Sequence, residues 1–269
     1  MTLGTDLSDD QTLISPSAYK QSGRSFAIRK LGEGLKGPGD YVGANNALLD
    51  ISRMHAVGVD MAGYWFVHPN IDGAAQAHMA GGIARAAGIK GLSCDCEVPD
   101  TEPWNQISSV MHAFLGAVAA QGFSNLIYDN KSWVDTLNAE QWGVPLWYAN
   151  PSVLMPDRGC VNWQYGLGTV PGIANTVDLD NWTGGPASYD LFFHGTRPLP
   201  QGDDMAVTND WLIRNCYRVV LHREVDGAGY TTWAEFLSGG GDAGEMWAKV
   251  QDSAEGQAVL AAERRSLGL

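Results

Sequence analysis

Two carboxylates spaced two residues apart, Asp95 and Glu97, are the residues of this sequence best suited to acid–base chemistry. They belong to residues 92–97, which read LSCDCE. Successive side chains of a strand point to opposite faces, so Asp95 and Glu97 would share one face and Cys94 and Cys96 the other. Proximity raises the pKa of one acid, so that one carboxyl can donate a proton while its neighbour stays ionised and stabilises positive charge. Cleavage of a glycosidic bond requires this division of labour.

Two further aspartates are expected to join this pair. Asp6 ends the first predicted strand and Asp178 lies on the last one. If the strands close into a barrel, the first and last strands are neighbours, and the carboxyl ends of barrel strands surround the active-site opening. We therefore expect all four acids at one opening. The alternative is that they cap a neighbouring helix or bind an arginine.

Short apolar runs alternate with helical segments over the first 182 residues, a pattern typical of strand-then-helix units around a parallel sheet. Strands are predicted at residues 3–7, 26–30, 61–66, 92–97, 125–128, 145–149, 161–165 and 177–180. Helices are predicted at residues 44–57, 74–87, 107–121 and 132–137. A regular (β/α)8 barrel takes about 250 residues. The sequence therefore predicts an α/β fold with an irregular, shortened (β/α)8-type barrel.

The pattern changes after the last predicted strand. Glycines and prolines cluster between residues 184 and 204, which indicates a linker. Beyond it, three short helical patterns are joined by glycine-rich turns. We expect a catalytic barrel over residues 1–185, a linker over residues 186–204 and a small all-α C-terminal domain over residues 205–269.

Seven short motifs, in the same order and at similar spacing, resemble those of the glycoside hydrolase family 25 lysozymes, the muramidases found in many bacteriophage endolysins. They cover residues 3–182. The motifs are GTDLS at 4–8, FAIRKLGEG at 26–34, GYWF at 63–66, CDCE at 94–97, PLWYA at 145–149, WQY at 163–165 and VDLD at 177–180. One departure is Trp65, which stands where the family usually has histidine and is expected to alter the wall of the groove.

The resemblance implies cleavage of the β-1,4 bond between N-acetylmuramic acid and N-acetylglucosamine in peptidoglycan. By this analogy Glu97 is the general acid, and Asp95, Asp6 and Asp178 form the supporting acidic group. The nucleophile stays open. It is either water or the 2-acetamido oxygen of the substrate, held by Asp95.

Aromatic and polar side chains at strand ends are candidates for sugar binding, because sugars pack flat C–H faces on aromatic rings and their hydroxyls need polar neighbours. Strand alternation sends only about half of them toward the opening. We select Tyr64, Trp147 and Gln164. Lys30 and Glu33 either form an ion pair that shapes the site or belong to a solvated turn.

Charge and motifs exclude several other functions. With 17 basic and 30 acidic residues the formal net charge is −13, which disfavours a nucleic-acid binder. None of the histidines lies in an H-E-x-x-H pattern, and no phosphate-binding loop is present. We therefore expect no cofactor and no metal ion. No apolar stretch reaches the ~18 residues that a membrane-spanning helix needs, so no membrane insertion is expected.

The N-terminal residues lack the basic and apolar regions of a secretory signal. We expect a phage endolysin that is made in the host cytoplasm, depends on a holin for export and acts on peptidoglycan at the cell wall. An alternative is a non-catalytic or weakly catalytic virion or tail component that binds peptidoglycan. A third is a glycosidase that acts on a different envelope glycan.

Residues 217–255 resemble a small helical domain of unknown function found in bacterial surface-layer-associated proteins, with the pattern Y-R-x-V-L-x-R-x-x-D-x-x-G and a later tryptophan. Cell-wall targeting is the expected role of this module. Asp226, Gly227 and Gly229 are expected to build a tight turn, which is either purely structural or holds a cation.

Overall fold

The computed structural model describes residues 2–37, 47–97 and 102–195, and beyond them residues 213, 217, 221, 223, 225–239, 246, 249–250 and 253–258. The chain divides into two compact units, Met1–Thr196 and Arg197–Leu269. Each unit is described separately.

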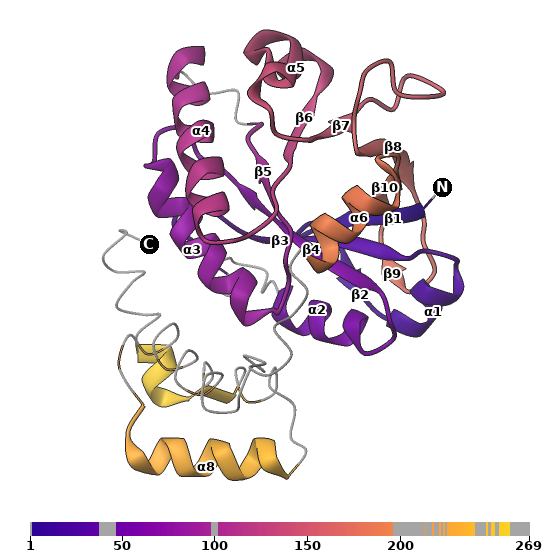
Figure 1. Ribbon diagram of the computed structural model, residues 1–269. Helices are drawn as coiled ribbons and strands as arrows, with labels where there is room; N and C mark the ends of the chain where they lie inside the picture. Colours follow the sequence, from indigo (N-terminus) through magenta and orange to yellow (C-terminus); the bar gives the residue numbers. More distant parts are fainter. Residues whose placement is uncertain are drawn as a thin grey trace. The chain divides into compact units, whose positions relative to one another are not determined.

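The first unit is a closed barrel of eight strands, which confirms the predicted α/β fold class (Figure 1). The strands are β1 (Thr2–Leu7), β3 (Phe26–Glu33), β4 (Asp60–Phe66), β5 (Leu92–Asp95), β6 (Ile127–Asn130), β7 (Leu146–Ala149), β8 (Asn162–Gly168) and β10 (Val177–Trp182). They follow one another around the barrel in the order β1, β10, β8, β7, β6, β5, β4, β3. Every predicted strand is present.

The last strand departs from the expected parallel sheet. β10 runs antiparallel to both β8 and β1, whereas the other neighbouring strands are parallel. A parallel pair needs a crossover connection of about a dozen residues or more, usually a helix. Only Thr169–Thr176 separate β8 from β10, and they carry the two-residue strand β9 (Ile173–Ala174), which pairs with β2 (Thr12–Leu13). The chain therefore reverses direction.

Helices follow most of the parallel strands. They are α1 (Pro16–Gln21), α2 (Ala47–His55), α3 (Gly73–Ala86), α4 (Trp104–Ala120), α5 (Lys131–Leu137) and the 3-10 helix η1 (Ala139–Trp142). The predicted helices at 74–87, 107–121 and 132–137 agree with α3, α4 and α5, and α4 begins three residues earlier than expected. Of the helix predicted at 44–57, residues 44–46 lie outside the described residues.

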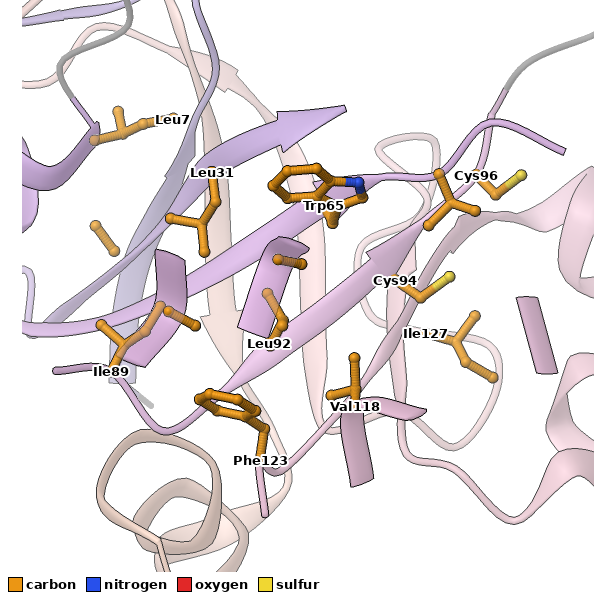
Figure 2. Close-up of a cluster of buried hydrophobic side chains, with 14 of the residues drawn as sticks. Leu7, Leu31, Trp65, Ile89, Leu92, Cys94, Cys96, Val118, Phe123 and Ile127 are labelled. Carbon is orange, nitrogen blue, oxygen red and sulfur yellow. The ribbon is translucent and has the colours of Figure 1, made fainter. Parts of the chain in front are cut away.

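Two apolar layers line the sheet. The outer layer fills the space between the sheet and helices α2 to α5, and it includes Leu92, Cys94, Cys96 and Ile127 (Figure 2). Both cysteines are fully buried there, as the expected alternation predicts, although β5 ends at Asp95, two residues earlier than predicted. Asp95, which lies between them, must therefore face the other side of the strand.

The inner layer fills the barrel itself and is largely aromatic. It includes Phe26, Tyr64, Trp147 and Trp182.

We call the end of the barrel where β3 to β7 finish the mouth. The opposite end, where these strands begin, is called the closed end.

The linker expected over residues 186–204 is wrong in its first half. Helix α6 (Gly185–His194) occupies this stretch, and it inserts Phe192 and Phe193 into the inner layer at the closed end. The glycines and the proline that suggested a linker instead begin the helix, since Pro186 occupies its first turn. Residues 196–204 lie outside the described residues.

In the second unit, the described residues include helix α8 (Gly227–Ser238). Asp226 caps this helix by accepting a hydrogen bond from the Gly229 N–H, at 2.8 Å. The other carboxylate oxygen of Asp226 lies 3.3 Å from Arg223, which also pairs with Glu255. A cap and an ion pair thus hold Asp226 at the start of α8, and Gly227 and Gly229, expected to build a tight turn with it, lie in the first turn of this helix.

Within the described part of the chain, no helix has the length and apolar character required to cross a membrane.

Candidate active site

The pairing of strands β1 and β10 brings two of the predicted acids together. Asp6 of β1 lies directly opposite Asp178 of β10 in the antiparallel register. Asp6 is near the carboxyl end of its strand, whereas Asp178 is near the beginning of β10, which runs the other way. Both therefore lie at the mouth, and the expected contact between the first and last barrel strands is confirmed.

Asp95 and Glu97 come from the carboxyl end of β5 at the same mouth. Asp95 interacts electrostatically with Glu97 and Asp6, and Asp6 in turn interacts with Asp178 and Glu97. These interactions connect the four acids, and we call Asp6, Asp95, Glu97 and Asp178 the acid cluster.

Burial gives the acid cluster unusual proton affinities. Burial, followed by the charge of Asp178, raises the pKa of Asp6 to about 8, against a hydrogen bond from Gln164 that lowers it. Burial and the nearby Glu97 raise the pKa of Asp95 well above its usual value. The Oδ1 atom of Asp95 has no hydrogen-bond partner within the described residues. Such a site can hold carboxylic acids that remain protonated near neutral pH.

Glu97 differs from Asp6 and Asp95 because it is only half-buried. Burial raises its pKa, and a hydrogen bond from Asn130 opposes this rise. The Nδ2 atom of Asn130 donates to Oε1 of Glu97 at 3.4 Å. No ion pair joins Glu97 to a basic side chain in the described part of the chain. The alternative that Glu97 binds an arginine is therefore not observed among these residues.

Gln164, selected as a binding residue, contacts the acid cluster. Its Nε2 atom donates to Oδ2 of Asp6 at 2.8 Å, and its Oε1 atom accepts from the Tyr128 hydroxyl at 3.0 Å. Both ends of the amide are thus engaged, and Gln164 holds Asp6 in place.

The prediction that Trp147 faces the opening and binds sugar is wrong. The ring is 1% exposed and lies inside the barrel, where its indole N–H donates to Oδ1 of Asp180 at 2.9 Å. Tyr64 packs on it edge to face and is itself 6% exposed. The barrel is filled by an aromatic layer, so the inward side of these strands is core beneath the acid cluster rather than an open wall.

Trp65 does not alter the groove wall as expected. It is fully buried in the outer layer, where its indole N–H donates to the Gly34 carbonyl oxygen (Figure 2).

The two interpretations of Lys30 and Glu33 are resolved in favour of the ion pair. The Nζ atom of Lys30 lies 2.9 Å from Glu33 and 3.3 Å from Asp9. Its positive charge also lowers the pKa of Asp95, although less than burial and neighbouring acids raise it. This cation is therefore shared among acids at the edge of the site.

Sequence reasoning missed several polar residues at the mouth. Asp129 and Asn130 directly follow the strand predicted at 125–128, and the structure extends that strand to include them. Asp180 is fully buried and hydrogen-bonded to Trp147 and Asn162. The signals were present in the sequence, as two polar residues at the end of a predicted strand and as a second aspartate two positions after Asp178.

Asp129 is a buried carboxyl without a cationic partner among the described residues. Burial and the nearby Glu97 raise its pKa to about 9. Its Oδ2 atom has no hydrogen-bond partner in the described structure. Asp129 is therefore protonated near neutral pH.

The acids do not form a metal site. Among the residues that the structure describes, no group of three or more histidine, cysteine, aspartate or glutamate side chains has the arrangement to hold a metal ion. The arrangement suits acid catalysis, in which a half-buried acid donates a proton beside carboxyls that stabilise positive charge.

A model of the glycosyl hydrolases family 25 matches residues 5–172 of this chain. No curated protein sequence gives a significant match.

Several solved structures have the same fold. The bacterial lysozyme from Streptomyces coelicolor is 23% identical, with a TM-score of 0.62 over 73% of this chain and 98% of that one. The muramidase from Trichobolus zukalii is 20% identical, with a TM-score of 0.60 over 73% of this chain and 100% of that one. The CTP1L endolysin is 23% identical, with a TM-score of 0.54 over 68% of this chain and 67% of that one.

Proposed function

Because this chain belongs to the glycosyl hydrolases family 25, and is thereby a glycoside hydrolase, we propose that it cleaves the β-1,4 bond between N-acetylmuramic acid and N-acetylglucosamine in peptidoglycan. The family match and the likeness to lysozymes and muramidases support peptidoglycan as the substrate. The observation that carries the proposal is the acid cluster, in which acids from three strands meet at the barrel mouth and Glu97 has no basic partner among the described residues.

In the proposed mechanism Glu97 is the general acid. It is more exposed than Asp95, and its raised pKa keeps more of it protonated near neutral pH than an ordinary glutamate. Its proton passes to the glycosidic oxygen as the bond to the anomeric carbon breaks. Ionised carboxylates of the neighbouring acids stabilise the positive charge that develops on the sugar ring. This positive charge in turn favours the ionised form of those acids.

Asp95 has one buried oxygen without a partner within the described residues, so the hydrogen-bonding capacity of this carboxyl is not satisfied in the free protein. It either orients the 2-acetamido group of the substrate as the nucleophile or assists an attacking water. Asp6 and Asp178 contribute negative charge when they are ionised, and Gln164 positions Asp6.

Tyr64 and Gln164 are proposed to border the bound sugar through their small exposed edges, and Lys30 with Glu33 to shape the rim. Trp147 is proposed to support the site from below through Asp180.

Mass spectrometry of the fragments released from purified cell walls tests this proposal. A muramidase produces fragments with N-acetylmuramic acid at the new reducing end. Fragments with N-acetylglucosamine at the reducing end, or cleavage of a different envelope glycan only, would contradict the assignment. Release of no fragments by a protein that binds the walls would favour the alternative of a peptidoglycan-binding virion component.

We also propose that the protein is a phage endolysin that reaches the wall from the host cytoplasm with the help of a holin, a role for which the likeness to the CTP1L endolysin is weak support. Expression in a susceptible host with and without a holin tests this. Lysis only with the holin is expected, and equal lysis without it would contradict holin dependence.

The second unit is proposed to target the cell wall. Removal of residues 205–269 is expected to reduce binding to intact walls and to spare hydrolysis of soluble glycan. Equal wall binding by the shortened protein would contradict this role.

A further inference from the structure

The side chain of Asn130 lies between Glu97 and the first turn of helix α5. Its Oδ1 atom accepts hydrogen bonds from the backbone N–H groups of Ser132 and Trp133, at 3.0 and 3.3 Å. Its Nδ2 atom donates to Oε1 of Glu97 at 3.4 Å. One amide therefore caps a helix and contacts the proposed general acid.

The cap determines which way the amide points. If the amide were flipped, its NH2 group would face two backbone N–H donors and its oxygen would face Glu97. That arrangement loses both cap hydrogen bonds, and a helix N-cap contributes about 1 kcal/mol. Asn130 can therefore present only a donor to Glu97.

A neutral carboxyl group has one oxygen that carries the proton and one that accepts hydrogen bonds. Since Asn130 donates to Oε1, that oxygen must be the acceptor when Glu97 is protonated. We propose that Asn130 is a positioning residue for Glu97, which anchors Oε1 and leaves Oε2 as the oxygen that carries the proton delivered to the substrate. This inference rests on the proposed function, in which Glu97 is the general acid.

Titratable groups from four strands interact with Glu97, and all of them carry negative charge when ionised: Asp6, Asp95, Tyr128, Asp129 and Asp178. Of these, the charge of Asp178 raises the pKa of Glu97 and so favours its protonated form. Asn130 is the group that opposes this effect, because its N–H stabilises the ionised carboxylate and lowers the pKa of Glu97. Asn130 thus limits how strongly Glu97 retains its proton, which an acid catalyst must release.

The distance of 3.4 Å is longer than an ordinary N–H···O hydrogen bond. Catalytic hydrogen bonds are often long in the free enzyme and tighten when substrate binds. The anchor is already aimed by the helix cap, so only a small movement of the Glu97 carboxyl is needed to shorten it.

Two substitutions separate the cap from the anchor. Serine and aspartate are both good N-cap residues, so Asn130→Ser and Asn130→Asp are expected to keep helix α5. Serine is too short to reach Glu97 and removes the donor. Aspartate replaces the donor with a second carboxyl, which can accept a proton from Oε1 and so draw it away from the substrate.

For Asn130→Ser we expect kcat on soluble glycan to fall on the order of 10-fold with little change in KM. The basic limb of the pH profile of kcat/KM should move to higher pH, since loss of the donor raises the pKa of Glu97. For Asn130→Asp we expect a larger fall in kcat and a larger shift in the same direction. Titration of the Glu97 carboxyl by NMR should show the same order of pKa values without any use of activity.

Asp72→Ser is the matched control. Asp72 caps helix α3 by accepting from the Ala75 N–H at 2.7 Å, and this exchange likewise replaces one cap residue with another. It is expected to leave the pH profile and the Glu97 titration unchanged.

The outcomes distinguish the inference from the proposed function. If the wild-type protein cleaves glycan but both Asn130 variants keep its pH profile and Glu97 titration, the positioning role is wrong and the proposed function stands. A loss of activity that merely follows a loss of stability, with no shift in either titration, also overturns the role. If the wild-type protein releases no reducing ends from peptidoglycan, the proposed function itself fails.

Discussion

At the closed end of the barrel, Asp60 accepts a hydrogen bond from the Tyr189 hydroxyl at 2.8 Å and lies 3.1 Å from the imidazole of His194. At the mouth, Asp95 has a buried oxygen without a partner in the described structure, and the groups around it are mostly other acids. The carboxylate at the closed end, Asp60, therefore has hydrogen-bond partners on both of its oxygens, whereas Asp95 at the mouth has one oxygen without a partner in the described structure.

The two ends also differ in what fills them. Helix α6 covers the closed end with an aromatic group in which Phe193 lies 5.1 Å from Phe26 and 4.5 Å from Tyr189, measured between ring centroids. The mouth instead contains buried carboxyls, and their burial lowers the free energy of unfolding. Unfavourable electrostatics of this kind are characteristic of functional sites. The difference supports the proposal that the mouth is the site of chemistry and that the closed end stabilises the barrel.

The largest expected effect is on activity, from Glu97→Gln at the mouth. This substitution keeps the shape of the side chain and its contact with Asn130 but removes the transferable proton. Hydrolysis of cell walls, followed as the fall in turbidity, should decrease by about 10²- to 10⁴-fold. The circular dichroism spectrum and thermal unfolding should remain those of a folded protein. Normal lysis by this variant would exclude Glu97 as the acid.

The largest expected effect on stability comes from Phe193→Ala at the closed end. Removal of a buried phenylalanine ring lowers the free energy of unfolding by about 3–5 kcal/mol, and we expect a loss in this range here. Urea unfolding measures this loss. The activity of the protein that remains folded should match that of the wild type. A large fall in kcat without loss of stability would show that the two ends are not separate in function.

A pH-dependent effect on stability is expected from Asp129→Asn. Asp129 has a pKa of about 9 in the folded protein, whereas the ordinary pKa of an aspartate is 3.8. Folding therefore retains a proton that the unfolded chain releases as the pH rises above 3.8, so this group lowers stability progressively up to about pH 9.

Asparagine carries no such proton, so the variant should gain thermal stability relative to the wild type at pH 8 but not at pH 4. For a protein of this size, each kcal/mol corresponds to a shift of about 2–4 °C in Tm. An equal difference in Tm at both pH values would contradict the raised pKa.

The smallest expected effect is that of His194→Gln at the closed end. Burial alone lowers the pKa of His194, but the hydrogen bond and charge of Asp60 outweigh it and raise the pKa above 6.5. The ion pair therefore contributes fully below pH 6.5 and is lost as the pH rises through the raised pKa.

His194 is half exposed, so solvent screening limits this contribution to well under about 1 kcal/mol. The free energy of unfolding of the variant should be lower than that of the wild type at pH 6 and equal to it at pH 9. A difference that grows toward pH 9 would contradict the ion pair.

Strand periodicity and barrel closure were sufficient to predict much of the site. Alternation along β5 placed Cys94 and Cys96 in the outer layer, and closure placed Asp6 beside Asp178. These predictions succeed because strand faces and neighbour relations depend on backbone geometry that every sequence shares.

The failures involve tertiary context. Trp147 was expected to face substrate, but the interior of the barrel is filled by aromatic side chains from several strands, which one strand's pattern cannot reveal. The start of α6 resembles a linker in sequence because glycine and proline mark both loops and helix beginnings. Its apolar face at Phe192 and Phe193 was the signal that favoured a helix.

The central claim is that the buried carboxyls at the mouth lower the stability of the protein and are needed for its activity. Asp95→Asn tests this claim most directly. The free energy of unfolding and the release of reducing ends from purified peptidoglycan should be measured at pH 7 on the same preparation. We predict that the variant is more stable than the wild type and loses most of its activity. A variant that is less stable, or that is equally stable and fully active, would contradict the claim.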